Sequence, residues 1–307
     1  MKILITGGAG FIGSHLVEHF HDCAEVRVLD NLRSGFRHNL NGRQHEFIAG
    51  TISDRELVRR AVAGVDYVFH LAAMVSVPES LANPVLCNEI NADGTLIVLE
   101  EAARAKVKKL VFSSSAAIYG DNPAVPKLET MPPEPKSPYA ITKLAGESYC
   151  KWFSDKGRLA TTCLRYFNVF GPRQNPASEY AAAVPIFIAR ALQNLPITIY
   201  GDGEQTRDFI SVKDVVAANV FFGTKAKAVG VFNVAGGETI TIKQLAQKII
   251  SVTGSTSEIR HLPERSGDVK HSLAAVDHLL KAGFKPAKNF DQALEMTVRD
   301  LAVKSAG

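Results

Sequence analysis

Short apolar runs alternate with helix-spaced apolar positions through the first half of this chain. The runs are short, rich in Val, Ile and Leu and bounded by turn residues, so they predict buried strands. Apolar residues that recur every three or four positions predict helices between them. The predicted strands span 2–6, 26–29, 46–49, 66–71, 109–112 and 160–166, and the predicted helices span 11–20, 54–63, 84–105 and 138–155. Such alternation predicts a parallel sheet with helices on both faces.

The alternation becomes irregular after Gly171-Pro172. We expect 209–216 to return to the sheet and to begin another helix. The other elements expected in this region are a helix at 184–192, strands at 197–200 and 231–234, and helices at 242–253 and 290–303. The pattern therefore predicts an α/β protein whose larger domain spans 1–170 and about 208–235. A smaller C-terminal α/β lobe would span about 171–207 and 236–307.

Polar residues and glycine follow several predicted strands directly. In a parallel sheet, ligands bind beyond the carboxyl ends of the strands. Gly7, Asp30, His70 and Ser115 all fall at such ends. We therefore expect these four residues to line one crevice.

The first strand runs straight into a glycine-rich turn, from Gly7 through Gly10 to Gly13, and then into a helix. In such a turn, glycines permit a tight bend, a close approach of the backbone to pyrophosphate and close packing of the helix. The pyrophosphate would lie at the positive end of the helix. Asp30 ends the second strand, at the separation expected for a carboxylate that binds the adenosine ribose. The stretch predicts a Rossmann-type site for NAD, because Asp30 would repel the 2′-phosphate of NADP.

Tyr139 and Lys143 are one helical turn apart, so they lie on one face of the predicted helix. Ser113, Ser114 and Ser115 end the strand before it. A neighbouring ammonium favours a phenolate, so we expect the Tyr139 pKa to fall from about 10 toward neutrality. Such a group could accept a proton from an alcohol. An ordinary helix surface is the alternative for so short a motif.

Composition and charge narrow the function further. A chain of 307 residues with 46% hydrophobic and 21% charged residues can bury a large core. The net charge of +4 comes from Lys and Arg that are spread along the chain, which disfavours a nucleic-acid partner. No apolar run reaches the roughly 18 residues that a membrane span needs. The N-terminal stretch does not resemble a secretion signal.

The four cysteines are Cys23, Cys87, Cys150 and Cys163. They form no CxxC pair, and no histidine lies at metal-ligand spacing from them. We therefore expect reduced thiols in a cytoplasmic protein, and we expect no metal site.

A series of motifs runs in order along nearly the whole chain: Thr6-Gly7-x-x-Gly10-x-x-Gly13, Asp30-Asn31-Leu32, His70-Leu71-Ala72-Ala73, Asn91, Ser113-Ser114-Ser115, Tyr139-x-x-x-Lys143, Arg165-Tyr166-Phe167-Asn168 and Arg207-Asp208-Phe209. Together they resemble the extended short-chain dehydrogenase/reductases. Within that family the chain looks most like a nucleotide-sugar 4-epimerase of the UDP-galactose 4-epimerase type.

The resemblance implies an isomerase that holds NAD and passes hydride to and from C4 of a sugar. Tyr139 would accept the proton of the 4-hydroxyl, Ser115 would hydrogen-bond the same oxygen, and Lys143 would keep Tyr139 ionised and bond the nicotinamide ribose. A homodimer through the helices at 84–105 and 138–155 is also implied. The implied cofactor-binding residues are Gly7, Gly10, Phe11, Ile12, Gly13, Asp30, Asn31, Arg33, Ser34, Ile52, Leu71, Ala72, Ala73, Asn91, Ser113, Tyr139, Lys143 and Tyr166.

The implied substrate is a UDP-hexose. Asn168 would hold phosphate, and Arg207 and Arg265 are donors suited to a diphosphate, with a surface arginine as the alternative. Asp268 would bond the uridine ribose or stabilise a turn, and Tyr200 would pack against uracil or lie in the core. The implied substrate-binding residues are Val75, Ser115, Tyr139, Asn168, Val184, Ile199, Tyr200, Arg207, Arg265, Asp268 and Ser272.

Ser272 bears on which hexose is accepted. The resemblance places this residue beside the 2-substituent of the sugar, where a tyrosine restricts relatives to glucose and galactose. A small residue leaves room for an N-acetyl group. The sequence therefore predicts that UDP-GlcNAc and UDP-GalNAc are accepted alongside UDP-Glc and UDP-Gal.

Three places depart from related patterns. Thr51 stands where many relatives have an aspartate that faces adenine, and Val75 stands where bacterial hexose epimerases have a lysine near the pyrophosphate. Ala116-Ala117 replaces the Asp-Glu pair of the 4,6-dehydratases, which disfavours dehydration. A UDP-glucuronate epimerase or decarboxylase remains an alternative. A protein that binds NAD without catalysis is a less favoured one.

Overall fold

The computed structural model describes residues 1–176, 183–264, 270–287 and 289–305. Within them, the largest element is a sheet of seven parallel strands in the order β10-β6-β5-β4-β1-β2-β3. The strands are β1(Lys2–Thr6), β2(Glu25–Asp30), β3(Glu46–Ala49), β4(Tyr67–His70), β5(Lys109–Ser115), β6(Ala160–Tyr166) and β10(Gly230–Val234). This sheet confirms the predicted doubly wound, Rossmann-type α/β fold.

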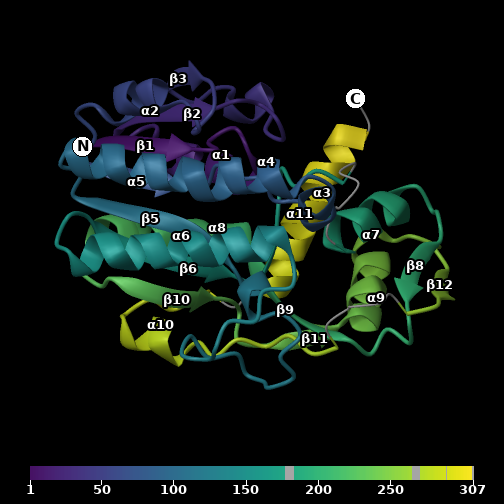
Figure 1. Cartoon of the computed structure of the whole chain (residues 1–307). Helices are drawn as coiled ribbons and strands as arrows, with labels where there is room; N and C mark the ends of the chain where they lie inside the picture. The colour runs from purple at the N-terminus through teal and green to yellow at the C-terminus, as the bar shows by residue number, and fades with distance from the viewer. Residues whose placement is uncertain (177–182, 265–269, 288, 306–307) are drawn as a thin grey trace.

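Two apolar clusters cover the two faces of this sheet, because successive residues of a strand point to opposite sides. Ile3 and Ile5 of β1 belong to one cluster, and Leu4 belongs to the other. The first cluster includes α1(Phe11–Phe20) and α8(Val212–Val220), and the second includes α2(Arg55–Val62), α5(Gly94–Arg104) and α6(Pro138–Asp155). Figure 1 shows α5 and α6 side by side in front of the sheet, with the smaller lobe beyond the carboxyl ends of the strands.

The prediction of one continuous helix over 84–105 is wrong in the middle of that range. The structure has α4(Pro84–Asn88), a π turn η2(Glu89–Asp93) and then α5. At the start of α5 the Thr95 hydroxyl donates to the Asn91 carbonyl of this turn at 2.5 Å. The wide turn allows the Asn91 amide to bond the backbone of Met74, at 2.7 Å and 3.0 Å. Such π turns commonly mark functional regions.

The short helix α3(Val77–Ala82) is absent from the sequence-based expectation. The Ser76 hydroxyl accepts from the Glu79 amide at 3.1 Å and caps this helix. A serine followed three residues later by glutamate is a helix-start signal that could have revealed it. Ser80 of α3 accepts the backbone N–H of Tyr139 at 3.2 Å, so this helix holds the start of α6.

We expected the strand that begins 209–216 to join the large sheet, and this prediction is wrong. β9(Thr206–Ser211) pairs instead with β7(Asn168–Phe170) and β11(Thr239–Thr241), because β10 occupies the edge beside β6. The helix that follows, α8, packs on the larger domain against α1, and Ile210 of β9 joins the same apolar cluster. A further two-stranded sheet joins β8(Ile197–Tyr200) to β12(Ile259–Leu262), which the sequence pattern missed.

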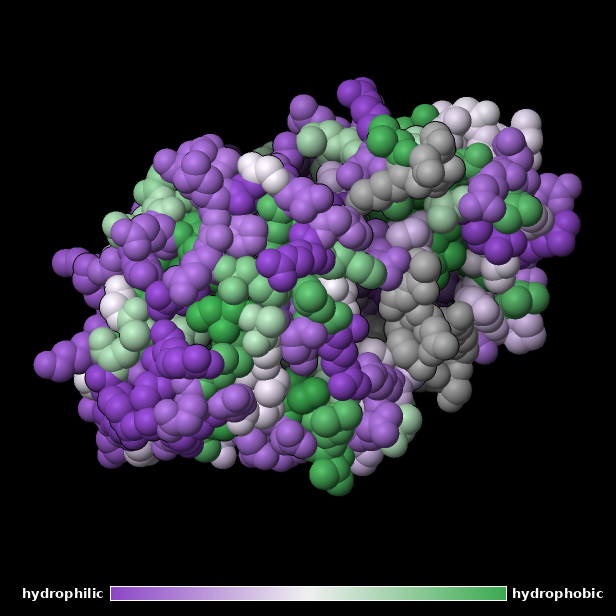
Figure 2. Space-filling model, turned by 90° about the horizontal axis from the view of Figure 1, so that it is seen from above, coloured by the Kyte–Doolittle hydropathy of each residue, from purple (hydrophilic) through white to green (hydrophobic). Residues whose placement is uncertain are grey.

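A third apolar cluster forms the core of the smaller lobe. It is built from α7(Ala183–Leu192), α9(Ile242–Thr253) and α11(Phe290–Ser305). Leu279 of α10(Asp277–Lys281) and Phe284 pack in the cluster of the large sheet, although they lie late in the chain. Seen from above, a hollow separates the larger body from the smaller one (Figure 2). The remaining short elements are η1(Arg37–Leu40), η3(Ala116–Tyr119) and η4(Phe221–Lys225).

Two kinds of feature are missing from the described ranges. None of the helices there is long and apolar enough to cross a membrane. The same ranges contain no group of three His, Cys, Asp or Glu side chains arranged to hold a metal ion.

Candidate functional site

The glycine turn after β1 is packed too closely for side chains. Gly7 has a φ of +72°, and a Cβ there would lie 2.7 Å from the Ala72 amide nitrogen. A Cβ on Gly13 would lie 2.1 Å from the Gly7 carbonyl oxygen. Glycine is therefore required at both positions, which leaves the backbone of the turn open to the cleft. This cradle at the start of α1 suits a pyrophosphate.

The Asp30 carboxylate is held at the end of β2. It accepts the Ala9 amide at 2.9 Å and the Leu32 amide at 2.7 Å. Burial raises the pKa of this carboxyl, and the two amide bonds oppose that effect. Asp30 thus joins the glycine turn to the loop after β2, and it faces the same cleft as the turn. The arrangement fits a dinucleotide with its ribose beside Asp30.

A cleft of about 600 Å³ opens at the carboxyl ends of β1, β2, β4 and β5. Its lining includes almost every residue predicted to bind the cofactor. The predicted residues that line it are Gly7, Gly10, Phe11, Ile12, Gly13, Asp30, Asn31, Arg33, Ser34, Ile52, Leu71, Ala72, Ala73, Val75, Ser113, Tyr139, Lys143 and Tyr166.

Three residues expected at the crevice are absent from the cleft lining: Ser115, at the end of β5, and Asn91 and His70, which lie behind the cleft. Asn91 is 2% exposed and holds Met74 and Thr142 rather than facing the cleft. His70 is 1% exposed, and its ring nitrogens lie 2.7 Å from the Thr6 hydroxyl and 3.0 Å from the Thr95 hydroxyl. Burial lowers the His70 pKa to about 3, so this ring stays neutral. Asn91 and His70 shape the cleft wall without touching a ligand in it.

Ser115, Tyr139 and Lys143 lie together where β5 meets α6. The Lys143 ammonium donates to the Ser113 carbonyl at 2.8 Å and lies 5.8 Å from the centre of the Tyr139 ring. The Ser115 hydroxyl hydrogen-bonds the Tyr139 phenol and accepts the Ala117 amide at 3.1 Å. This arrangement can transfer a proton to or from an alcohol held in the cleft.

The predicted fall of the Tyr139 pKa is wrong for the protein alone. Burial raises the pKa of this phenol, and the bond from Ser115 only partly opposes the rise. Burial also lowers the Lys143 pKa to about 8. The ammonium is directed at the Ser113 carbonyl, so its charge does not overcome the desolvation of the phenolate.

The residues predicted to bind the nucleotide of a substrate gather around β9. The Asn168 amide donates to the Asp208 carbonyl at 2.8 Å, and the Ser272 amide donates to the Thr206 carbonyl at 3.2 Å. Arg207 lies between them and lines a second cavity, of about 360 Å³. Asn168 of β7, Arg207 of β9 and Ser272, on a segment that bonds β9, therefore lie on adjoining parts of the chain.

Other predicted substrate contacts have a different placement. Val184 and Ile199 are 0% and 1% exposed in the core of the smaller lobe, so their side chains do not face a substrate. The burial of both follows from the apolar spacing of α7 and β8. Tyr200 is half-buried at the end of β8. Arg265 and Asp268 lie outside the described residues.

Asp208 is the buried centre of this region. Its carboxylate accepts the amides of Gly236 at 2.8 Å, Gly237 at 3.2 Å and Ala274 at 3.1 Å. Burial raises its pKa to about 6. Asp208 thereby joins β9 to the turn after β10 and to the strand segment that follows Ser272.

Asp208→Asn is therefore expected to destabilise the protein by about 1–3 kcal/mol, because an amide NH₂ would face buried amide donors. Urea denaturation followed by circular dichroism measures the change. Asp155→Asn, at an exposed position at the end of α6, is the matched control and should change stability little. Equal stabilities of the two variants would contradict the assignment.

Sequence reasoning missed several residues of the cleft wall. Gln174 and Asn175 line the cleft, as do Gly35, Phe36 and Met74. Gln174 and Asn175 come soon after β7, which ends on the ligand side of the fold. Their position just after a strand end could have indicated that they face the ligand. The irregular pattern after Gly171-Pro172 predicted no strand at this place, so the sequence did not reveal that position.

Known proteins share this sequence pattern and this fold. Residues 3–235 match the NAD dependent epimerase/dehydratase family. The chain is similar to a UDP-N-acetylglucosamine 4-epimerase from Methanobrevibacter ruminantium M1, which was solved in complex with UDP-N-acetylmuramic acid. The two chains are 42% identical with a TM-score of 0.96, and the match covers 99% of this chain and 98% of that one. A UDP-glucose 4-epimerase from Thermotoga maritima, solved with UDP-glucose, is 39% identical with a TM-score of 0.94 and full coverage of both chains at 100%. A UDP-glucose 4-epimerase from Thermus thermophilus, solved with NAD, is 38% identical with a TM-score of 0.89 and coverage of 98% of each chain.

Proposed function

Because this chain belongs to the NAD dependent epimerase/dehydratase family and is an NAD-dependent UDP-sugar 4-epimerase, we propose that its substrates include UDP-GlcNAc and UDP-GalNAc alongside UDP-Glc and UDP-Gal. The observation that carries this proposal is Ser272, a small residue on the segment beside β9. The similarity at 42% identity to a UDP-N-acetylglucosamine 4-epimerase supports the same substrate class.

The residues around the cleft divide the work between binding and proton transfer. The Gly7–Gly13 turn would hold the pyrophosphate of NAD, and Asp30 would hold its adenosine ribose. Bound NAD supplies the hydride chemistry at C4 of the sugar. Tyr139 takes the proton of the 4-hydroxyl, and Ser115 hydrogen-bonds the same oxygen. Lys143 favours the ionised form of Tyr139, and protonated Tyr139 returns the proton to the C4 oxygen as the opposite epimer forms.

The residues around β9 bind the nucleotide of the substrate and select the sugar. Arg207 and Asn168 bind the diphosphate. From the sequence we place Arg265 with them and Asp268 at the uridine ribose. The family resemblance supports a place for Ser272 beside the 2-substituent of the hexose. The Ser272 backbone amide bonds the Thr206 carbonyl of β9. A hydroxymethyl side chain there leaves space for an N-acetyl group.

Purified protein incubated with each UDP-sugar, without added NAD⁺, tests this function. We expect the C4 epimer of UDP-GlcNAc and of UDP-Glc to form, measured by chromatography of the products. Conversion of UDP-Glc with no conversion of UDP-GlcNAc would contradict the proposed substrate range. UDP-glucuronate is included in the same screen, and its exclusive conversion would favour the uronate alternative.

Ser272→Tyr is expected to remove activity on UDP-GlcNAc while most of the activity on UDP-Glc is retained, because the larger ring would fill the space beside the 2-substituent. A pocket that loses room for a group in this way commonly discriminates by about 10–200-fold. Ratios of kcat/KM for the two substrates measure the effect. Equal losses on both would indicate damage to the fold around β9 rather than a change in selectivity.

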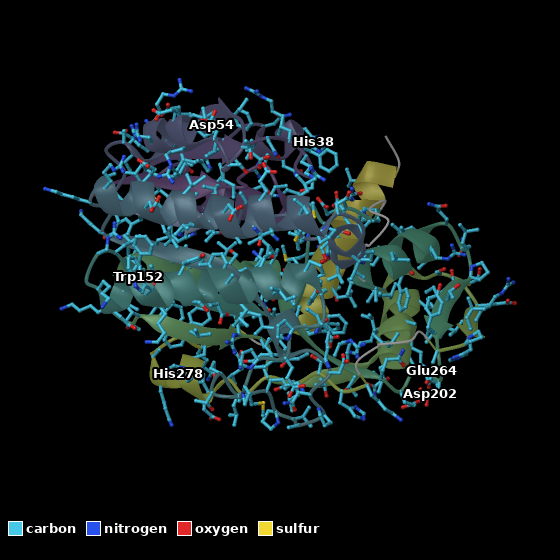
Figure 3. The ribbon with its side chains drawn as sticks, in the orientation of Figure 1. His38, Asp54, Trp152, Asp202, Glu264 and His278 are labelled. Carbon is cyan, nitrogen blue, oxygen red and sulfur yellow. The ribbon has the colours of Figure 1, made fainter. Side chains whose placement is uncertain are left out.

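We also propose a homodimer in which the helical region 84–105, which contains α4 and α5, pairs together with α6 against the same helices of a second copy. Exposed apolar side chains on and beside these helices support this interface: Leu81 is 60% exposed, Val85 81%, Ile141 54% and Trp152 46%. Leu81 belongs to α3, and both α3 and α4 contact α6. Trp152 lies at the end of α6 that is remote from the smaller lobe (Figure 3), so the surface extends along the helix. Exposed apolar groups of this size commonly mark protein interfaces.

Ile141→Glu is expected to convert the dimer to a monomer, because the new carboxylate would be buried without a partner at the interface. Sedimentation velocity measures the change in mass. Val229→Glu replaces another half-exposed apolar residue, away from α4 and α6, and is the control that should leave the dimer intact. A monomeric unmodified protein would contradict the interface.

The cysteines support a cytoplasmic location as part of this proposal. Cys23, Cys87, Cys150 and Cys163 are all free thiols, and the last three are buried. Free thiols are typical of proteins in reducing compartments. Cell fractionation with an antibody to the protein tests the location.

A further inference from the structure

A buried ion pair lies directly behind the strand end that carries the three serines. Glu147 of α6 and Arg165 of β6 are each 5% exposed. The Arg165 guanidinium donates to both carboxylate oxygens, from Nε to Oε1 at 2.8 Å and from Nη2 to Oε2 at 2.7 Å. Such bidentate pairs fix the relative placement of two elements. The proposed chemistry at Tyr139 assigns this pair no task.

The same carboxylate also holds the end of β5. The Ser114 hydroxyl donates to Oε1 of Glu147 at 2.5 Å. Ser114 stands between Ser113, whose carbonyl accepts from Lys143 at 2.8 Å, and Ser115, whose hydroxyl bonds Tyr139. Glu147 follows Lys143 by one helical turn on α6. The carboxylate therefore ties the middle residue of this strand end to the helix that carries the proton-transfer groups.

Arg165 extends the connection toward the smaller lobe. Its guanidinium lies 4.9 Å from the centre of the Tyr119 ring and donates to the Glu129 carbonyl at 3.4 Å. The Glu129 carboxylate accepts the Asn233 amide at 2.8 Å, and Tyr119 donates to the Asn233 side chain at 2.7 Å. Asn233 in turn donates to the Lys127 carbonyl at 2.8 Å.

The last link of this network reaches the neighbourhood of Ser272. The Lys127 amide donates to the Leu273 carbonyl at 2.8 Å, and the Ala275 amide donates to the Lys127 carbonyl at 2.9 Å. The proline-rich segment that contains Lys127 therefore runs beside 273–275. One buried polar network thus connects the substrate-side segment to the serines and to α6.

We propose that Glu147 is a positioning residue for the epimerase reaction, and that its pairing with Arg165 and Ser114 holds the end of β5 against α6 so that Ser115, Tyr139 and Lys143 keep their mutual geometry. This inference rests on the proposed function. A buried ion pair is seldom more stable than an apolar pair of similar volume. The network connects the proton-transfer residues to the substrate-side segment. Positioning of these residues therefore explains the buried charge of Glu147 better than a gain in stability does.

The charge of Glu147 also acts on Lys143. The titratable groups that face the Lys143 ammonium in the described structure are Cys87 of α4, Cys150, Glu147 and Tyr139 of α6, and His70 of β4. Glu147 is the carboxylate among them, and its negative charge favours the ammonium. Without that charge, Lys143 would lose its proton at a lower pH than in the unmodified protein.

Glu147→Gln is the test of this proposal. We expect kcat on UDP-Glc to fall by about 10- to 100-fold, since small misplacement of reacting groups costs on that order. KM and the amount of bound NAD should stay unchanged, and the alkaline fall of kcat should move to lower pH. Amide hydrogen exchange in 113–117 should become faster, which is a readout independent of turnover.

Two further variants separate positioning from stability. Glu101→Gln is the matched control, because Glu101 of α5 is also buried and paired with arginines, Arg55 and Arg59, but touches no residue of the cleft. It should lower the melting temperature and leave kcat, its pH profile and the exchange of 113–117 unchanged. Ser114→Ala removes one bond and keeps the ion pair, and it should lower kcat in the same direction by less.

The proposal is overturned if folded Glu147→Gln keeps the kcat and pH profile of the unmodified protein, or if Glu101→Gln lowers kcat as much. Where Glu147→Gln does not fold, Ser114→Ala decides: an unchanged kcat and unchanged exchange in 113–117 count against the proposal. Failure of the proposed function has a different signature, because the unmodified protein would then convert none of the UDP-sugars.

Discussion

Tyr139→Phe is expected to lower kcat on every accepted UDP-sugar by about 10²–10⁴-fold, the usual contribution of a positioned proton-transfer group. The substitution removes one oxygen and keeps the ring, which lies beside Lys143 and at the wall of the cleft. Binding of NAD and UDP-sugar should therefore change little. Steady-state kinetics measure kcat and KM, and absorbance of the released cofactor measures bound NAD.

Tyr149→Phe is the matched control for this prediction. Tyr149 lies on the same helix, is 38% exposed and does not line the cleft. It should keep the kcat of the unmodified protein. If Tyr139→Phe also kept that kcat, the proton would have another acceptor, and the assignment of Tyr139 would be lost.

The pKa values around Tyr139 set the direction of the pH dependence. Burial raises the pKa of the phenol, and burial lowers the Lys143 pKa to about 8. Because Lys143 acts as an ammonium, its contribution is complete well below pH 8 and is lost as the pH rises through that value. We therefore expect kcat to fall on the alkaline side.

Much of the fold and of the cleft could be predicted from the sequence, because both depend on local pattern. A strand followed by Gly7 to Gly13 and a helix has few alternatives, and a residue at a strand end in a parallel sheet must lie at the ligand edge. This reasoning placed Asp30, Ser113 and Tyr139 correctly in one cleft.

The same reasoning failed where side-chain direction or distant packing decides. His70 ends β4, but its side chain lies on a helix-covered face of the sheet, where its ring hydrogen-bonds the Thr95 hydroxyl of α5. Asn91 sits in a π turn that no apolar spacing reveals. Spacing also places Tyr139 and Lys143 on one face, but it says nothing of how deeply the pair is buried. Burial reversed the expected shift of the Tyr139 pKa.

Gly13→Ala is expected to abolish tight binding of NAD, because the added methyl group meets the backbone of Gly7 and Gly8 in the glycine turn. Its Cβ would lie 2.1 Å from the Gly7 carbonyl oxygen and 2.8 Å from the Gly8 Cα. Neither atom belongs to a flexible side chain, so α1 must move away from the glycine turn. Overpacking of this kind costs about 1–3 kcal/mol of stability. A displacement on the order of 1 Å at the cradle is enough to weaken a positioned site about 10²-fold.

Isothermal titration with NAD measures the affinity of the Gly13→Ala variant, and thermal denaturation measures its stability. Gly42→Ala is the control, because Gly42 has a φ of +74° but nothing within 4 Å of an added Cβ. Its positive φ costs alanine about 1–2 kcal/mol, so stability falls in both variants. Affinity for NAD should fall only in Gly13→Ala, since only that glycine closes the pyrophosphate cradle. Unchanged affinity in Gly13→Ala would mean that the cofactor lies elsewhere than against the start of α1.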